Sequence, residues 1–398
     1  MFRFNADCNL LICQKSKIAD WIEHFQKFYP GMDVYNLTIK KEFENFISHD
    51  VAWSGYHGCT PSIGVINYEL AWRRKDLLDL KKGFTLMLDE SSLIQNDKAK
   101  QTKFIMKLQP SNVILLSGTP CSGKYENLLT QMHLLGWNIS KQLYERQYVR
   151  WKTVETDGFF HKIVDPDDPY INVERLKSKM REHGAVFKKT EECFDLPEQN
   201  FTKVKVKTTK EYKEFIKEGY IQLEDGVELI GDMEFKKRLI ARQLCGVYSV
   251  DKLEAFRDLV QSTSDRLIVF YNFKDEVKQL IRIANEEQRP WSIVCGDQKT
   301  LVAYEEQSDS ITFIQYQAGA MGLNLQKANK IIYFTLPERS ELFEQSKKRI
   351  HRIGQSQPCF YYIMMCEKSV EERIYSTLLQ LKDYTDELFK GDEINGSI

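Results

Sequence analysis

Short apolar segments alternate with longer segments of helical periodicity along the chain. In the first half, apolar runs at residues 9–13, 63–66, 84–88 and 113–116 each end in polar or turn-forming residues. The segment 17–28 carries apolar side chains at helical spacing. Buried parallel strands are nearly continuous apolar runs, and amphipathic helices cover them. The sequence therefore predicts an α/β fold with parallel sheets flanked by helices, in which functional residues follow the carboxyl ends of the strands.

The alternation repeats in the second half, which predicts two lobes. A chain of 398 residues is too long for one ordinary core, and its 42% hydrophobic content can fill two cores. Apolar runs recur at residues 266–273, 291–297 and 311–315. We expect the first lobe in residues 1–200, and a largely helical connector followed by the second lobe in residues 201–398.

An acidic pair follows the apolar run that ends at Leu88. A strand there would place Asp89 and Glu90 at the edge of the sheet. In the Walker B arrangement, the first carboxylate holds magnesium through water, and the second orients and deprotonates the attacking water. Asp89 is therefore the candidate magnesium residue and Glu90 the candidate base. Two adjacent carboxylates after a strand also occur as an ordinary helix N-cap, and that interpretation stays open.

The most informative stretch is QSKKRIHRIGQ, at residues 345–355. Arg349 and Arg352 lie four and seven residues after Gln345, so a helix would place both guanidiniums on one face, one turn apart. Two guanidinium groups, which are always charged, can bind nucleotide phosphates and stabilise the charge that develops during phosphoryl transfer. A solvated basic helix is the alternative, because two lysines lie beside these arginines.

The pattern RxHRxGQ after a glutamine resembles motif six of the Snf-type (SWI/SNF-related) DNA-dependent ATPases, a branch of helicase superfamily two. The earlier motifs of that family come in a fixed order, and similar segments occur in that order over residues 9–389. The segment LSGTP resembles motif three. This resemblance implies that Ser117, Gly118 and Thr119 relay the nucleotide state toward the DNA.

Further segments resemble the family's motifs for contacting DNA and ATP. The residues that follow the first apolar run resemble motif Ia, which implies DNA-backbone contacts by Lys15 and Ser16, although an ordinary βα turn is an equal alternative. The segment RLIVFYNF resembles motif four and implies a DNA contact at Phe273. The segment QAGAMGLNL resembles motif five, whose glycines let the backbone approach phosphate. The implied ATP-binding residues are Gly322, Asn324 and Gln345.

Two segments depart from the family's pattern. Ser91 and Ser92 stand where the family usually has Ala-His, which affects the coupling of the acidic motif to motif three but leaves the acidic pair intact. Before motif five, the family usually has Ser, Thr and a basic residue. This chain has Gln315, Tyr316 and Gln317 at those positions, so the DNA contacts of that motif are not carried over.

The family's phosphate loop has no clear counterpart. The segment GTPCSGK fits the pattern GxxxxGK, but Tyr125 stands where a Ser or Thr binds magnesium. In the family, the phosphate loop precedes motif Ia by a few dozen residues, whereas eight residues precede that strand here. We expect an N-terminal partner or an upstream segment to supply the loop. Loss of the loop's strand is expected to leave unpaired backbone in the middle of the first sheet.

The resemblance implies two RecA-like lobes that bind ATP and Mg²⁺ between them and hydrolyse ATP while moving on double-stranded DNA. The alternative from another class is a catalytically inactive nucleic-acid-binding remnant, or a fragment of a split motor. An unrelated phosphate-loop enzyme that uses GTPCSGK is a third interpretation, which Tyr125 disfavours.

Composition limits the remaining choices. The net charge of -1 provides no overall positive field, so DNA binding would need a local groove. Nine cysteines without a CxxC pair argue against a disulfide framework or a zinc site. No apolar run approaches the roughly 20 residues that cross a bilayer. We expect no membrane partner and a cytoplasmic protein of a bacterial or phage-infected cell.

Overall fold

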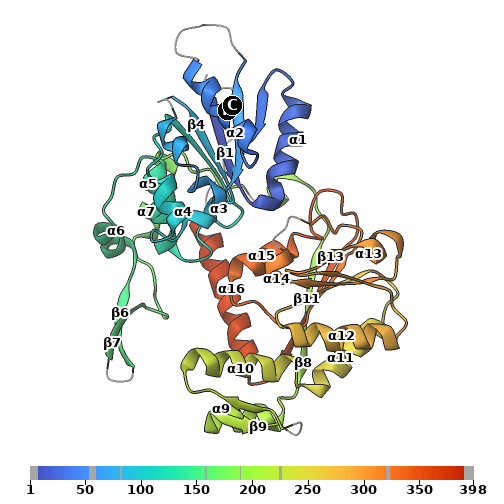
Figure 1. Ribbon diagram of the computed structural model, residues 1–398. Coiled ribbons are helices and arrows are strands. Elements are labelled where there is room, and N and C mark those ends of the chain that lie inside the picture. The colour runs from blue at the N-terminus through green and yellow to red at the C-terminus, as the bar shows by residue number, and fades with distance from the viewer. Residues whose placement is uncertain are drawn as a thin grey trace. The chain divides into compact units, whose positions relative to one another are not determined.

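The computed structural model describes residues 8–52, 60–80, 83–156, 159–188, 190–223, 226–319 and 323–389. Two compact units divide the chain (Figure 1). One comprises Met1–Phe187 and the segment that begins at Asp383, and the other spans Lys188–Lys382. Each unit contains its own sheet with helices around it. The predicted α/β fold, with parallel sheets flanked by helices, is confirmed.

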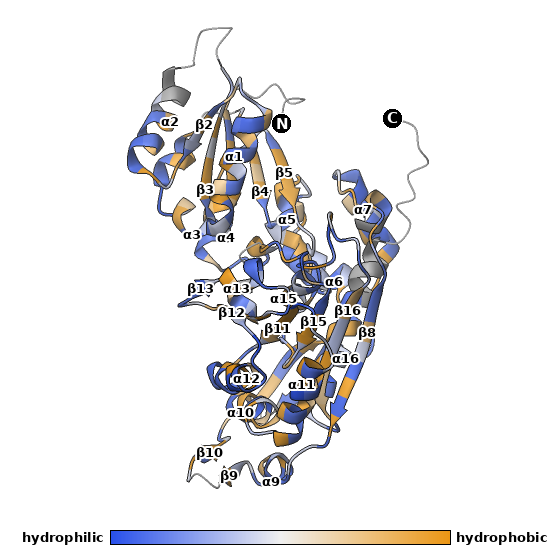
Figure 2. Cartoon of the chain, turned by 90° about the vertical axis from the view of Figure 1, so that its right-hand side faces the viewer, coloured by the Kyte–Doolittle hydropathy of each residue, from blue (hydrophilic) through white to orange (hydrophobic). Residues whose placement is uncertain are grey.

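The first unit is built on a five-stranded sheet in the order β2-β3-β1-β4-β5, in which every pair is parallel. Its strands are β1 (Cys8–Cys13), β2 (Asp33–Asn36), β3 (Ser62–Asn67), β4 (Thr85–Asp89) and β5 (Asn112–Leu116). The four predicted apolar runs became β1, β3, β4 and β5, and Figure 2 shows their concentration of apolar residues. The short strand β2 was not predicted, because its sequence DVYN has no apolar run.

Helices cover both faces of this sheet. Phe25 of α1 packs on one face with Leu11 of β1, while Phe46 of α2 and Phe104 of α4 pack on the other. The helical elements up to this unit's end are η2 (Lys15–Lys17), α1 (Ile18–Phe28), α2 (Lys40–Ala52), α3 (Tyr68–Ala71), η3 (Lys75–Asp79), η4 (Ser91–Ile94), α4 (Lys100–Ile105), η5 (Tyr125–Leu128), α5 (Leu129–Leu134), α6 (Lys141–Tyr148) and α7 (Val173–Glu182).

A two-stranded antiparallel hairpin extends from the first unit between α6 and α7 (Figure 1). It consists of β6 (Trp151–Thr156) and β7 (Phe159–Val164). The side chains of Phe159 and Phe160 are 69% and 74% exposed. Such a hairpin has no core of its own and is marginally stable alone, so its attachment to the α6–α7 region supports it.

The sheet of the first unit has no gap next to the acidic strand. β4 pairs with β1 on one side and with β5 on the other, so the expectation of unpaired backbone in the middle of the sheet is wrong. All five residues of β5 pair with β4. The open edge on this side, among the described strands, is therefore the outer edge of β5.

The second unit is built on a seven-stranded sheet in the order β13-β12-β14-β11-β15-β16-β8, in which only the β12–β13 pair is antiparallel. Its strands are β8 (Gln199–Val206), β11 (Leu267–Tyr271), β12 (Trp291–Val294), β13 (Lys299–Thr300), β14 (Ile311–Gln315), β15 (Lys330–Tyr333) and β16 (Cys359–Cys366). β8 pairs with β16 over eight residues. The boundary expected at residue 200 therefore lies inside a strand of the second sheet.

Helices and a small hairpin complete the second unit. They are α8 (Thr190–Cys193), α9 (Lys210–Glu218), β9 (Tyr220–Gln222), β10 (Glu228–Ile230), α10 (Glu234–Gly246), α11 (Val250–Gln261), α12 (Lys274–Glu286), α13 (Val302–Glu306), α14 (Tyr316–Gly319), α15 (Ser340–Lys347) and α16 (Val370–Phe389). Apolar residues of α9 and α10 pack into the same core as β11 and β15.

The helix expected to carry Arg349 and Arg352 ends earlier. α15 stops at Lys347, and both arginines lie in the turns that follow, so their predicted placement on one helical face is wrong. The carbonyl of Arg349 accepts a hydrogen bond from the backbone N–H of Leu325 (3.1 Å), which a continuing helix would not offer to a distant segment. The chain is thus drawn out of the helix by contact with the 323–325 segment.

The buried side chain of Gln355 fixes these turns. Its Nε2 atom donates to the carbonyls of Gln326 (3.2 Å), Ala328 (2.9 Å) and Ile350 (3.4 Å). Its Oε1 atom accepts from the backbone N–H groups of two residues that follow it. One amide side chain therefore satisfies backbone groups from three turns that have no strand or helix partners.

A second buried polar residue of this unit, Glu276 of α12, is only partly satisfied. Its Oε2 atom accepts from the backbone N–H groups of Asn272 (2.9 Å) and Phe273 (3.0 Å), and from Thr335 Oγ1 (3.0 Å). Its buried Oε1 atom has no partner in the described part of the chain. Gly246 permits this packing, because a Cβ there would lie 2.0 Å from Oε1. Burial raises the pKa of Glu276 from 4.5 to about 7, although its hydrogen bonds act in the opposite direction.

Replacing Gln355 by Ala should destabilise the second unit. The substitution removes the donor to three backbone carbonyls, so we expect the free energy of unfolding to fall by about 2 kcal/mol in urea unfolding followed by circular dichroism. Gln357→Ala is the matched control, because the side chain of Gln357 is exposed. Equal stability of the two variants would contradict the role of Gln355 as a clamp.

Glu276→Gln should stabilise the protein more at pH 8 than at pH 5. A raised pKa means that the native state favours the neutral carboxyl, so the stability it contributes is present below pH 4.5 and is lost as the pH rises through about 7. Glutamine has the shape of the neutral form and does not titrate. The gain in unfolding free energy over the wild type should grow by about 3 kcal/mol at most between these pH values. Asp275→Asn, at an exposed neighbour, should show no such pH dependence, and a flat difference for Glu276→Gln would refute the prediction.

Candidate functional site

Asp89 and Glu90 lie at the carboxyl end of β4, where the parallel strands of the first sheet end together. Asp89 is paired in register with Leu116 of β5, so the loops that begin at Glu90 and Ser117 leave the same edge of the sheet. Glu90 has φ 55° and ψ 56°, the left-handed region that a residue with a side chain rarely adopts. Tyr68 donates its hydroxyl to the carbonyl of Asp89 (2.9 Å) and so supports this turn. Strained backbone of this kind is common at functional sites.

The surroundings of Asp89 suit a carboxylate that accepts hydrogen bonds. Trp21 of α1 donates its indole N–H to Asp89 Oδ2 (2.9 Å). Burial, and next the charge of Asp89, raise the pKa of the Cys13 thiol to about 12, and the same two causes raise the pKa of the Tyr68 hydroxyl. Both neighbours therefore stay neutral. The second oxygen of the Asp89 carboxylate can accept a hydrogen bond from a water of a hydrated Mg²⁺ ion, so the residues fit the predicted role.

Ser117, Gly118 and Thr119 follow β5 beside the acidic loop. The backbone N–H of Thr119 donates to Ser117 Oγ (3.1 Å), which closes a tight turn. The Oγ1 atom of Thr119 is buried and has no hydrogen-bond partner in the described ranges. A buried hydroxyl without a partner is costly, so this turn carries an unsatisfied polar group.

The segment GTPCSGK does not fit a phosphate loop. Tyr125, which occupies the Ser/Thr position of that motif, is buried and stacks on Tyr170, with ring centroids 4.0 Å apart. Tyr170 also donates its hydroxyl to the carbonyl of Gly123 (3.1 Å). Lys124 is exposed and donates its backbone N–H to the carbonyl of Cys121 (2.9 Å). The loop is therefore the start of the α5 region rather than a cradle for phosphate.

Lys15 and Ser16, predicted to contact DNA, are exposed in η2 after β1. Lys15 lies on the rim of a cavity of about 900 Å³ at the carboxyl ends of β1, β2 and β3. Arg73, Glu23 and Glu69 also line it, together with amide and apolar side chains. The lining thus holds two cations and two carboxylates, so a phosphate contact here would depend on the exposed Lys15 and Ser16 rather than on a positively charged cavity.

In the second unit, the segments 323–325 and 349–352 are joined. Asn324 Oδ1 accepts a hydrogen bond from Arg352 Nη1, and the 325–349 backbone bond lies next to it. Gln345 is half-buried on α15, two residues before the helix ends. The structure thus brings together Asn324 and Arg352, which sequence reasoning had named separately. Gly322 lies outside the described residues.

Phe273, the predicted DNA contact of the second unit, already has a partner. The guanidinium of Arg242 lies 5.3 Å from its ring centroid. Arg242 is itself held by a hydrogen bond to the carbonyl of Leu336 (3.0 Å). The half-buried ring of Phe273 is therefore oriented by a cation–π contact, and a DNA contact would use only its exposed edge.

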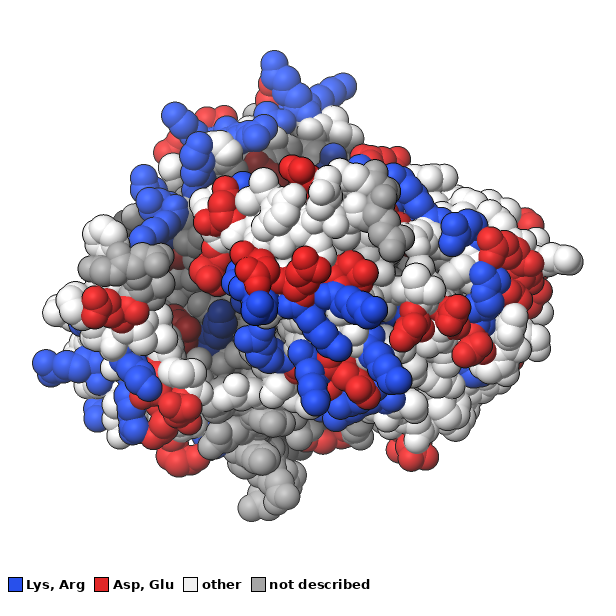
Figure 3. Space-filling model, turned by 90° about the horizontal axis from the view of Figure 1, so that it is seen from below, with Lys and Arg blue, Asp and Glu red and all other residues white. Residues whose placement is uncertain are grey.

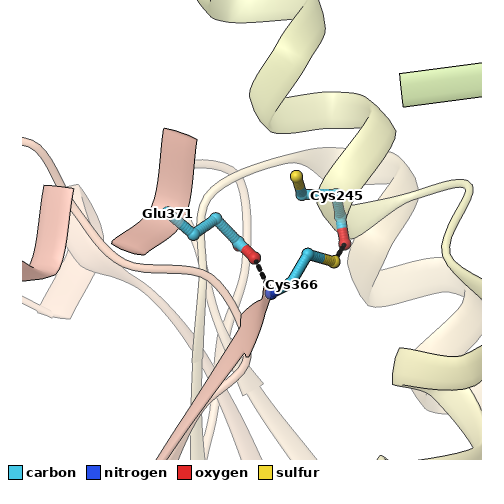
Figure 4. Close-up of side chains that lie close together, drawn as sticks. All are labelled: Cys245, Cys366 and Glu371. Carbon is cyan, nitrogen blue, oxygen red and sulfur yellow. Dashed lines mark hydrogen bonds between the residues drawn. The ribbon is translucent and has the colours of Figure 1, made fainter. Parts of the chain in front are cut away.

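Three potential metal ligands meet in the core of the second unit, namely Cys245, Cys366 and Glu371 (Figure 4). Both carboxylate oxygens of Glu371 are engaged, one by Lys252 Nζ (2.6 Å) and the other by the backbone N–H of Cys366 (2.9 Å). Figure 4 shows the Cys366 thiol pointing to the carbonyl of Cys245. A buried ammonium already supplies the positive charge, so this cluster is a satisfied part of the core rather than a metal site.

The chain's surface charges are mixed. On the face in Figure 3, Lys and Arg side chains lie beside Asp and Glu side chains. In the second unit, for example, Arg257 forms ion pairs with both Glu286 and Glu287. This agrees with the net charge of -1. Among the described helices, none is both long enough and apolar enough to cross a bilayer.

Sequence reasoning missed three residues that support the site. Trp21 lies in the segment 17–28 that was predicted as a helix, but no role was assigned to it, and Tyr68 was not singled out. Gln131 carried no signal, because its partners lie 11 and 40 residues away in the sequence. A polar residue on the apolar face of a helix is the only available sign, and it does not name the partner.

Two protein families match this chain. A SNF2-related domain matches residues 5–247, and a helicase conserved C-terminal domain matches residues 251–354. An uncharacterized ATP-dependent helicase of Mycoplasma genitalium is 22% identical over 416 aligned residues, covering 96% of this chain and 37% of that protein. The human SWI/SNF-related matrix-associated actin-dependent regulator of chromatin subfamily A member 1 is 22% identical over 404 residues, covering 92% and 37%. The chain thus spans 37% of the length of each of these two relatives.

Among solved structures, the Sulfolobus solfataricus SWI2/SNF2 ATPase core in complex with dsDNA matches with a TM-score of 0.39 and 19% identity, covering 98% of this chain and 84% of that one. The family matches are the stronger finding, because the SNF2-related domain alone extends over more than half of the chain. With its acidic pair on β4 and its arginine turns after α15, the chain belongs to the SNF2-related family of helicases.

Proposed function

We propose that the chain is the motor module of an ATP-dependent translocase on double-stranded DNA, with ATP bound between the two lobes. The observation that carries this proposal is the loop pair at one edge of the first sheet, where Asp89 and Glu90 lie beside Ser117–Thr119. A carboxylate pair next to a second polar loop can couple hydrolysis to a change of shape.

The chain's own residues divide the chemistry between them. Asp89 holds a hydrated Mg²⁺ ion, which neutralises charge on the nucleotide phosphates when it is bound. Glu90 orients the attacking water and takes its proton. Arg349 and Arg352 stabilise the charge that develops on the transferred phosphoryl group. Gln345, Asn324 and the glycine at position 322 hold the nucleotide, and the bond between Asn324 and Arg352 orients one guanidinium before ATP arrives.

DNA binding uses phosphate contacts. Lys15 and Ser16 are exposed at the carboxyl end of β1, beside a cavity that Arg73 also lines. Phe273 adds an apolar contact in the second lobe. Contacts of this kind do not read base sequence and weaken with salt.

The phosphate loop is supplied by an upstream segment or by an N-terminal partner, as an added strand on β5. All five residues of β5, NVILL, are uncharged, and Leu116 is 37% exposed, whereas β4 beside it is buried. Parallel strands are normally covered, and an apolar open edge is a place where another strand pairs. A parallel strand added there would end at the same edge as Asp89 and Ser117, where the phosphates are proposed to lie.

A catalytically inactive remnant is the second candidate. The buried position of Tyr125 favours it, because the only GK sequence in the chain is then part of a helix start. In that case the first lobe binds DNA through Lys15 and Ser16 but does not turn over ATP.

The proposal predicts ATP hydrolysis that double-stranded DNA stimulates and that Glu90→Gln and Arg352→Ala each abolish. Removal of the base Glu90 or of the charge-stabilising guanidinium of Arg352 should lower turnover at least about 100-fold. Arg339→Ala is the control, because Arg339 is an exposed arginine at the start of α15. The measurement is phosphate release with and without DNA by the 398-residue chain, which should be inactive alone and active once the phosphate loop is supplied.

Other results of this assay separate the alternatives. No turnover, together with salt-sensitive DNA binding that survives both substitutions, would favour the remnant or a split motor. Repeating the assay with the chain extended by the segment encoded upstream then decides between these two. Turnover that appears on extension and is lost with Leu116→Lys would support a strand added to β5.

A further inference from the structure

A buried hydrogen-bond chain connects the acidic loop to the loop after β5. Ser91 follows directly after Glu90 and is 1% exposed. Its Oγ atom donates to Gln131 Oε1 (2.9 Å), and Gln131 Nε2 donates to the carbonyl of Pro120 (2.6 Å). Gln131 belongs to α5 and is 4% exposed. One amide side chain thus bridges the two loops. The coupling of these loops was in question, because Ser91 and Ser92 stand where the family usually has Ala-His.

The orientation of the Gln131 amide is determined by its partners. A backbone carbonyl such as that of Pro120 only accepts, so the NH₂ group must face Pro120 and the oxygen must face Ser91. Ser91 then has to donate its hydroxyl proton. Ser91, Gln131 and Pro120 therefore have one set of donor and acceptor orientations that satisfies all their hydrogen bonds. In a buried network of this kind, a change at one residue disturbs the bonds of the others.

A second amide strengthens the same acceptor. Gln95 Nε2 donates to the carbonyl of Pro120 (2.9 Å), and Asn127 Nδ2 donates to Gln95 Oε1 (3.1 Å). Pro120 is therefore held by Gln95, which follows η4, and by Gln131 of α5. Nearby residues of the loop are less well satisfied than Pro120. Thr119 has a buried hydroxyl without a partner in the described ranges, and Ser122 has the left-handed φ of 54°. The loop is fixed at Pro120 and keeps strained or unsatisfied groups around it.

The strained residue of the acidic loop is adjacent to the chain's first member. Glu90 adopts its left-handed conformation immediately before Ser91. Any change in the backbone of Glu90 therefore moves Ser91 Oγ, and the hydrogen bonds pass that displacement to Gln131 and Pro120. The Oγ1 atom of Thr119, one residue before Pro120, has no partner among the described residues, and its bonding is what such a displacement would change.

We propose that Gln131 is a positioning residue that couples the acidic loop to the Ser117–Pro120 loop through Ser91. In this chain, Ser91 and Gln131 together do the work for which the family uses the Ala-His sequence. This inference rests on the proposed function for its meaning, since the state transmitted is that of the nucleotide at Asp89 and Glu90. The physical coupling itself can be tested without any turnover.

Thr130 provides a matched control. It precedes Gln131 on α5, it is buried, and its Oγ1 donates to the carbonyl of Ile94 in η4 (2.7 Å). Thr130→Val therefore removes one buried hydrogen bond between the same two elements but leaves the link to Pro120 intact. A purely structural role for Gln131 would make Gln131→Met and Thr130→Val behave alike.

The first test is amide hydrogen exchange of the full chain, read in peptides that cover residues 117–123. Ser91→Ala and Gln131→Met should each accelerate exchange there, and the double variant should be no faster than the faster single variant. Thr130→Val should accelerate exchange only around residues 91–95. Additive effects of Ser91→Ala and Gln131→Met, or an equal effect of Thr130→Val at 117–123, would overturn the proposal.

The second test uses turnover, if the wild type shows it. The ratio of ATP hydrolysis with DNA to that without DNA should fall about tenfold for Ser91→Ala and Gln131→Met, within the ordinary range of coupling between sites. Ser91→Thr, which keeps the hydroxyl, should restore the ratio, and Thr130→Val should keep the ratio of the wild type. An unchanged ratio in Ser91→Ala would refute the coupling. A wild type without turnover even when the phosphate loop is supplied would count against the proposed function alone, and hydrogen exchange would still decide the coupling.

Discussion

The parallel pairing of β4 between β1 and β5 is the constraint on which the first lobe's site depends. Because all strands of this sheet run in one direction, their carboxyl ends meet at a single edge, and polar residues that are far apart in the sequence become neighbours. Asp89 comes from β4 and Tyr68 follows β3, while Trp21 lies on the helix after β1. The buried strands fix the backbone positions of these groups. The loops need only small adjustments of backbone angle, such as the left-handed turn at Glu90, to aim the carboxylates.

The second lobe positions its arginines in a different way. A helix would set Arg349 and Arg352 by its own periodicity, whereas turns are set by whatever satisfies their backbone groups. Gln355 performs that task with five hydrogen bonds, three given and two accepted. Backbone bonds such as that from the N–H of His351 to the carbonyl of Lys347 also hold the turns, but these bonds are fewer and less regular than those of a helix. This arrangement suits residues proposed to engage a nucleotide only when it is bound.

Much of the fold and part of the site followed from local sequence. The apolar runs that form β1, β3, β4 and β5 could be predicted, because strands buried on both faces are almost wholly apolar. The end of α15 could not be predicted from the local sequence, because the segment after Lys347 has good helical residues. The hydrogen bond found just beyond the helix end comes from the distant backbone N–H of Leu325. Gln131 could not be found for the same reason, because a buried amide is explained only by partners that the fold supplies. Local patterns thus predict elements, while long-range hydrogen bonds decide their ends and their links.

The loop after β5 gives independent support to an added phosphate-binding strand. A phosphate loop needs several backbone N–H groups that point to one anion. In this loop, the N–H of Thr119 is bonded to Ser117 and that of Lys124 to Cys121, while Gln131 and Gln95 hold the carbonyl of Pro120. Turning these two N–H groups toward a phosphate would break bonds within the loop, and moving Pro120 would break its bonds to the two glutamines. On the proposed function the cradle therefore comes from a strand beside β5, whose outer edge is open among the described strands.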